Sequence, residues 1–270
     1  MKRFVFSNLY SSSIRSVLFI WLGLAIIFTL AACGGEEGKE EAPKTELEQV
    51  EEFWKKNDYE NAGKILKAYI AAHPKDLKAI LLQAKIAISQ KRSKETLESV
   101  NIGLEIDPKN TEFLALKGRA YYYVSNFKEA INYSRQALKL NPKMALPYLV
   151  IGEIFLRQGK KEKSIKVLKE AVKLDPTMVE AINKLSSALI KTNDFISAKE
   201  YLDKAIKIDK EDPGVNFNLA VVYNKLGDGE KAYGYINEAL RLYKEKEDAR
   251  WANQSRQMKK VIEDRFKIKS

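Results

Sequence analysis

Residues 141–176, NPKMALPYLVIGEIFLRQGKKEKSIKVLKEAVKLDP, begin with an Asn-Pro pair and end with an Asp-Pro pair. Pro142 and Pro176 are 34 residues apart, and Pro74 and Pro108 continue the same interval toward the N-terminus. Such an interval is the period of a helix–turn–helix repeat. Proline has no amide hydrogen and disfavours helical geometry in the residue before it, so each of these prolines marks the end of a helix. The stretch therefore predicts one antiparallel helix pair.

The same register extends over most of the 270-residue chain. Lys210 stands where the proline of the fifth unit is expected, yet the sixth unit stays in phase, because Leu219, Ala220, Tyr223 and Gly227 keep the register. The sequence has no run of alternating apolar and polar residues that would indicate strands. Six units of paired helices are predicted, at 43–76, 77–110, 111–144, 145–178, 179–212 and 213–246.

The recurring residues resemble the signature of the tetratricopeptide repeat family. Small residues recur where two helices touch closely, and glycine or asparagine, which tolerate positive φ, recur at the turn between them. The resemblance implies an all-α fold, a right-handed α-solenoid of about six tetratricopeptide helix hairpins over residues 46–246, with residues 247–270 as a capping helix and basic tail. The small residues include Gly118, Gly152, Ala130, Ala137, Ala171, Ala198, Ala205, Ala232 and Ala239, and the turn residues are Asn57, Gly159, Asn193 and Gly227.

The N-terminus resembles a bacterial lipoprotein signal peptide. Positively charged residues precede an uncharged apolar run at 17–30, and small residues then lead to Cys33, the only cysteine in the chain. We expect residues 1–32 to be a signal peptide, Cys33 to be lipidated with palmitate among its acyl groups, and residues 33–45 to form a flexible tether. An uncleaved transmembrane anchor stays open as an alternative, because 20 uncharged residues separate Arg15 from Glu36.

The resemblance to a lipoprotein also implies a location in the cell envelope. Gly34 follows the cysteine, so the aspartate that retains many lipoproteins in the inner membrane is absent. The protein is therefore expected to be lipid-anchored, in the outer membrane and facing the periplasm if the cell is Gram-negative. Beyond residue 32 the chain has 44 Lys and Arg against 36 Asp and Glu. A basic domain can bind nucleic acid, anionic lipid or acidic protein, and export argues against nucleic acid. Acidic residues are interspersed among the basic ones, so the sequence favours an ordinary solvated surface over a dedicated anion site.

The sequence offers no group of residues suited to catalysis. His73 is the only histidine, and no glycine-rich phosphate loop, nucleophile motif or cysteine cluster is present. We therefore expect no catalytic residues, no metal site and no cofactor, and the protein is not expected to be an enzyme.

In the family that the chain resembles, the first helix of each unit lines a concave groove. The corresponding positions here form an apolar strip with a basic edge, which suits an extended or helical peptide with acidic residues. The alternative that these side chains pack only against the neighbouring unit stays open. The predicted partner-binding residues are Arg119, Tyr122, Tyr123, Leu149, Leu156, Arg157, Ile190, Lys191, Phe217, Asn224 and Lys225.

The combination of lipid anchor and repeats predicts a membrane-anchored scaffold or adaptor for protein partners in envelope assembly. It is similar to the small repeat lipoproteins of type IV pilus or secretin biogenesis, which makes that pathway the leading specific hypothesis by analogy of fold. Two alternatives remain: an adaptor for peptidoglycan enzymes or outer-membrane protein assembly, and a non-catalytic regulatory subunit of an envelope enzyme.

Overall fold

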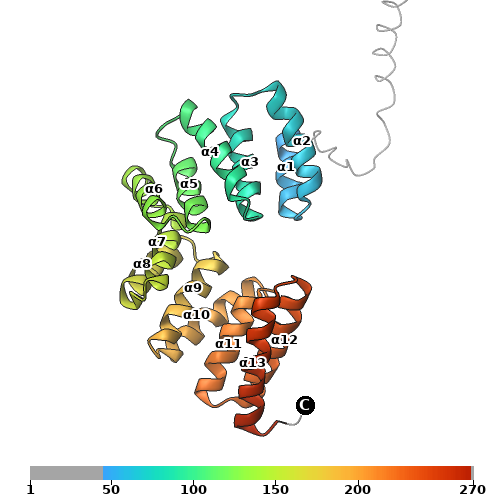
Figure 1. Cartoon of the computed structure of the whole chain (residues 1–270), viewed down its shortest axis with the longest axis vertical. Coiled ribbons are helices and arrows are strands. Elements are labelled where there is room, and N and C mark those ends of the chain that lie inside the picture. The colour runs from blue at the N-terminus through green and yellow to red at the C-terminus, as the bar shows by residue number, and fades with distance from the viewer. Residues whose placement is uncertain (1–44, 269–270) are drawn as a thin grey trace, which may run out of the picture. The chain divides into compact units, whose positions relative to one another are not determined.

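A computed structural model describes residues 45–268, which belong to the second of two compact units of the chain, Lys44–Ser270. Thirteen helices follow one another in the described range, and it contains no strand (Figure 1). No helix within residues 45–268 is both long and apolar enough to span a membrane. The predicted signal peptide, Cys33 and the tether up to residue 44 lie outside the described residues.

The first twelve helices form six hairpins, one in each 34-residue unit, and α13 follows the sixth. The predicted all-α solenoid of about six hairpins with an additional C-terminal helix is therefore confirmed. The helices are α1 (Glu46–Lys55), α2 (Tyr59–Ala72), α3 (Leu77–Ser89), α4 (Ser93–Ile106), α5 (Thr111–Tyr123), α6 (Phe127–Leu140), α7 (Ala145–Arg157), α8 (Lys161–Leu174), α9 (Val179–Lys191), α10 (Phe195–Ile208), α11 (Pro213–Leu226), α12 (Gly229–Glu245) and α13 (Ala249–Phe266).

Each helix packs against the next one along the chain, and the first helices of neighbouring hairpins also contact one another. Small residues make the close contacts within a hairpin possible. A Cβ atom added at Gly152 of α7 would lie 2.5 Å from Cγ of Leu168 in α8, well inside normal contact distance. Ala137, Ala171 and Ala205 are fully buried at one register position of successive second helices. The repeated small residues thus set how closely the paired helices approach.

The turn inside every hairpin contains one residue in the left-handed region. These residues have φ between 58° and 88° and recur at the 34-residue interval. Only two of the six are glycine, and two are Lys91 and Ser125, which have no special tolerance for positive φ. The packing of the two helices therefore imposes the turn even where the sequence lacks glycine or asparagine. The six residues are Asn57, Lys91, Ser125, Gly159, Asn193 and Gly227.

The last helix, α13, covers the apolar face of the sixth hairpin, where a seventh hairpin would otherwise pack. Ala252, Ser255 and Ile262 of α13 are buried. The Trp251 ring stacks on Tyr243 of α12, with 5.7 Å between ring centroids, and meets Phe217 of α11 edge-on at 5.4 Å. This arrangement is that of a capping helix, which a solenoid needs at its end.

Candidate partner-binding site

A hollow of about 560 Å³ lies among α5, α7, α9, the turn after α3 and the start of α13. The α-helical hairpins place the first helices α5, α7 and α9 side by side, so residues one or two repeat periods apart meet there. Six of the predicted partner-binding residues line it: Arg119, Tyr122, Tyr123, Leu156, Arg157 and Lys191. The other lining residues are Lys91, Glu153, Glu180, Lys184, Arg250 and Trp251.

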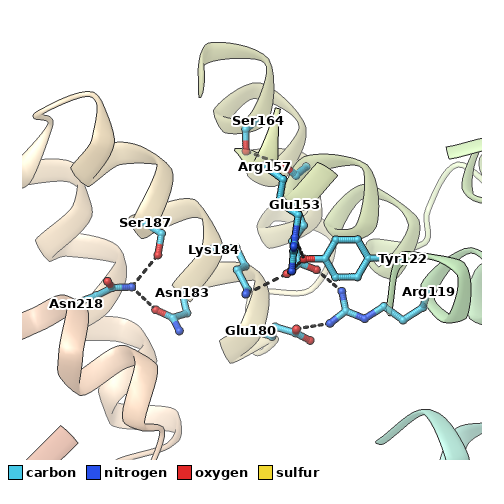
Figure 2. Close-up of polar contacts among 11 residues, drawn as sticks. Arg119, Tyr122, Glu153, Arg157, Ser164, Glu180, Asn183, Lys184, Ser187 and Asn218 are labelled. Carbon is cyan, nitrogen blue, oxygen red and sulfur yellow. Dashed lines mark hydrogen bonds and ion pairs between the residues drawn. The ribbon is translucent and has the colours of Figure 1, made fainter. Parts of the chain in front are cut away.

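A network of ion pairs forms the floor of the hollow and joins three successive hairpins (Figure 2). Arg119 of α5 pairs with Glu153 of α7 and with Glu180 of α9, and its side chain is 3% exposed. Glu153, also 3% exposed, pairs with Lys184 Nζ at 3.0 Å and accepts a hydrogen bond from Tyr122 Oη at 3.1 Å. The buried carboxylate thus has three donors around it.

The charges of this network support one another against the cost of burial. Burial disfavours the charged Arg119 guanidinium, but Glu153 and Glu180 outweigh this effect and raise the pKa of Arg119 above its ordinary value. Burial likewise acts to raise the pKa of Glu153, but Arg119 and Lys184 outweigh it, so that pKa is lowered. The same carboxylate raises the pKa of Lys184 against the effect of burial. Arg119, Glu153 and Lys184 are therefore all charged at neutral pH.

Four further cations line the hollow without a carboxylate partner. Lys91, Arg157, Lys191 and Arg250 are exposed and make no ion pair with any residue in the described range 45–268. Six cations and two carboxylates give the lining a formal charge of +4. Apolar surface accompanies this charge, because Trp251 is 36% exposed, and Tyr123 and Leu156 are partly exposed. The geometry suits a segment that carries both carboxylates and apolar side chains.

Comparison with known families gives matches to two tetratricopeptide repeat models, at residues 116–179 and 189–253. The chain contains tetratricopeptide repeats. A search of curated proteins finds no match. As a tetratricopeptide repeat protein, the chain is a scaffold for protein interactions, and domains of this family bind protein or peptide partners.

Solved structures of other repeat proteins are similar to the chain in fold. PilF of Pseudomonas aeruginosa aligns with a TM-score of 0.58 and 17% identity, over 73% of this chain and 90% of PilF. PilW, a type IV pilus biogenesis factor, aligns with a TM-score of 0.58 and 20% identity, over 77% of this chain and 96% of PilW. The Cut9–Hcn1 complex of the APC/C aligns with a TM-score of 0.61 and 18% identity, over 77% of this chain and 40% of the other chain. At these identities the likeness shows the fold alone.

Two of the predicted partner-binding residues, Arg119 and Tyr122, make their polar contacts with other residues of the chain. Arg119 was expected to face a partner, but two carboxylates of the chain already engage its guanidinium. Tyr122 is 6% exposed. Its hydroxyl donates to Glu153 and accepts from Arg157 Nε at 3.0 Å. Tyr122 therefore positions Arg157 beside the hollow.

Two other predicted partner-binding residues are wrong because the structure buries them. Leu149 is fully buried in the core with Leu168 of α8. Asn224 is 3% exposed, and its backbone oxygen accepts a hydrogen bond from Arg265 of α13 at 2.6 Å. Burial in each case leaves no surface for a partner.

The remaining predicted residues are accessible but lie outside the lining of the hollow. Phe217 is partly buried and packs on Trp251. Ile190 is partly exposed, and Lys225 is exposed on α11. These three residues therefore contribute nothing to the lining of the hollow.

Six lining residues were not predicted, and only some of them left a signal in the sequence. Arg119 and Glu153 are one repeat period apart, so opposite charges at one register position indicate a contact between neighbouring first helices. Arg250 and Trp251 lie beyond the last repeat, where the register gives no information.

Within residues 45–268, no group of three or more His, Cys, Asp or Glu side chains is arranged to hold a metal ion.

Proposed function

We propose that the chain is a membrane-anchored scaffold in cell-envelope assembly and that it holds an acidic segment of a protein partner in the hollow. The observation that carries this proposal is the group of four unpaired cations, Lys91, Arg157, Lys191 and Arg250, beside partly exposed aromatic and apolar side chains. Acidic side chains of a partner would pair with the cations, and its apolar side chains would cover the exposed part of Trp251.

The membrane anchor in this proposal is the lipid on Cys33. The apolar run, the small residues and the single cysteine at their end support it. Labelling cells with radioactive palmitate tests it directly. The wild-type chain should take up label, and Cys33→Ala should take up none and remain in the precursor form. If Cys33→Ala still takes up label and is still processed, the lipid anchor is contradicted. The proposed binding in the hollow is independent of that result.

The pathway in this proposal is type IV pilus biogenesis. Its support is the alignment with PilF and PilW, which extends over most of each of those chains as well as most of this one. PilW is described as a type IV pilus biogenesis factor. We propose that this chain also serves type IV pilus biogenesis and that it does so by holding a component of the machinery at the membrane while it assembles.

Photocrosslinking in intact cells tests the scaffold and its pathway together. A photoreactive residue in place of Tyr123, which lines the hollow, should capture a protein partner. Replacing Arg157 and Lys191 with alanine should lower the yield, whereas Lys225→Ala should not. Lys225 is the matched control, because it occupies the register position of Lys191 one period later but lies outside the hollow.

Equal yields from all of these variants would contradict the assignment of the partner to the hollow. A captured pilus component would support the pathway. A captured peptidoglycan hydrolase or barrel-assembly protein would overturn the pathway and leave the scaffold in place.

A further inference from the structure

The two carboxylates that pair with Arg119 have different surroundings. Glu153 is 3% exposed and is held by Arg119, Lys184 and Tyr122. Glu180 is 47% exposed, and within residues 45–268 its carboxylate accepts a hydrogen bond from Arg119 alone. One carboxylate is therefore fixed by the core, and the other is held by one contact at the edge of the solvent.

Glu180 is also placed where it can leave that contact without disturbing the fold. It is the second residue of α9, and its side chain extends from the first turn of the helix toward Arg119 (Figure 2). Rotation about its side-chain bonds would turn the carboxylate into solvent while the helix stays in place. The Glu180 carboxylate itself would be solvated after this rotation, because its side chain is already 47% exposed.

Arg119, in contrast, has no such freedom. Its side chain is 3% exposed, and a buried guanidinium that loses an acceptor is strongly disfavoured. One side of it remains paired with Glu153. The other side needs an acceptor at the hollow, but nothing in the structure requires that this acceptor be Glu180.

We propose that Glu180 is an internal substitute for a partner's carboxylate, which an incoming acidic side chain displaces from Arg119. This inference rests on the proposed binding of an acidic segment in the hollow. The exchange replaces one ion pair with another, so Arg119 stays paired throughout. A neutral ligand offers no replacement, and Glu180 then stays on Arg119. Glu180 therefore keeps Arg119 paired when no partner is bound, and only a ligand that brings a carboxylate can take its place at this point of the hollow.

The test compares the affinity of the full-length chain, in detergent micelles, for a fluorescein-labelled peptide that alternates Glu and Leu. Fluorescence anisotropy measures the Kd for the wild type and for Glu180→Gln. Glu180 competes with the peptide carboxylate for Arg119, so removing it should tighten binding by roughly threefold or more. Glu180→Ala should do the same, because it also removes the competing carboxylate.

Glu200→Gln is the matched control. Glu200 is exposed on α10, lies outside the hollow and makes no ion pair within the described range, so its replacement changes the net charge equally. Its Kd should stay within about twofold of the wild type, since exposed charges beyond a Debye length of ~8 Å are screened. A peptide with Gln in place of Glu should bind weakly to every variant and gain nothing from Glu180→Gln.

The outcomes separate this inference from the function on which it rests. If the wild type binds the Glu peptide through Arg157 and Lys191, but Glu180→Gln leaves the Kd unchanged, the inference is wrong and the scaffold stands. The inference is also wrong if Glu200→Gln tightens binding as much as Glu180→Gln does. If Arg157→Ala with Lys191→Ala has no effect on binding, the hollow is not the site, and the proposed function fails as well.

Discussion

Replacing Glu153 with leucine tests whether the buried ion pairs hold three hairpins together. The Glu153 side chain is 3% exposed and is surrounded by Arg119, Lys184 and Tyr122. Removing one partner of a buried pair costs about 3–5 kcal/mol, because the other charge is left without compensation. Arg119 keeps Glu180, and Lys184 is 36% exposed and can turn toward solvent. We therefore expect a loss at the lower end of that range, about 3 kcal/mol.

A second variant distinguishes the loss of an ion pair from the loss of packing. Arg119→Met together with Glu153→Leu removes both charges and keeps side chains of similar size, so the double variant should be at least ~1 kcal/mol more stable than Glu153→Leu. The coupling between the two positions should reach roughly 2 kcal/mol. The free energies come from urea unfolding followed by circular dichroism. Hydrogen exchange of α5, α7 and α9 then locates the loss, because repeat arrays can unfold in part.

Two results would refute this reasoning. If Glu153→Leu is within ~0.5 kcal/mol of the wild type, the network does not stabilise the fold. If the losses from Arg119→Met and Glu153→Leu simply add in the double variant, the two side chains act independently. The contact seen between them would then carry no energetic weight.

Two further predictions concern acid stability and helix contacts. The pKa of Glu153 in the folded chain lies below its ordinary value of 4.5. The contribution of Glu153 to stability is therefore complete above pH 4.5 and is lost as the pH falls through the lowered pKa. Glu153→Gln should therefore flatten the dependence of the unfolding free energy on pH in this acid range. Gly152→Ala should lower stability by about 1–3 kcal/mol, because the added carbon would lie 2.5 Å from Leu168. Gly63→Ala is its control: nothing lies within 4 Å of the added carbon, and alanine favours the helix by up to ~1 kcal/mol, so thermal unfolding should show a gain.

The sequence predicted the helix pairs well because the repeat period constrains many residues at once. A single proline could have other causes, but small residues, turn residues and prolines at one period leave one arrangement. The turns at Lys91 and Ser125 show the limit of this reasoning, since neither residue favours the left-handed conformation that it adopts. At these two turns the packing of the two helices determines the backbone conformation, and no local sequence pattern predicts it.

The register says which face of a helix a residue occupies but not what covers that face. Arg157 and Lys191, which the register assigned to the groove face, both line the hollow. Asn224 was misplaced because α13, which has no repeat register, covers it. Glu180 and Lys184 were missed because their roles depend on how closely three first helices approach, a distance that no single unit encodes.

Inverting the charge of the hollow tests most directly whether its unpaired cations select an acidic segment. The measurement is the Kd of the full-length chain for two labelled peptides, one alternating Glu with Leu and one alternating Lys with Leu. The wild type should prefer the Glu peptide. The variant in which glutamate replaces all four unpaired cations should prefer the Lys peptide, because the formal charge of the lining falls from +4 to −4 beside an unchanged apolar surface. These four cations are Lys91, Arg157, Lys191 and Arg250. A variant that still prefers the Glu peptide would contradict the account.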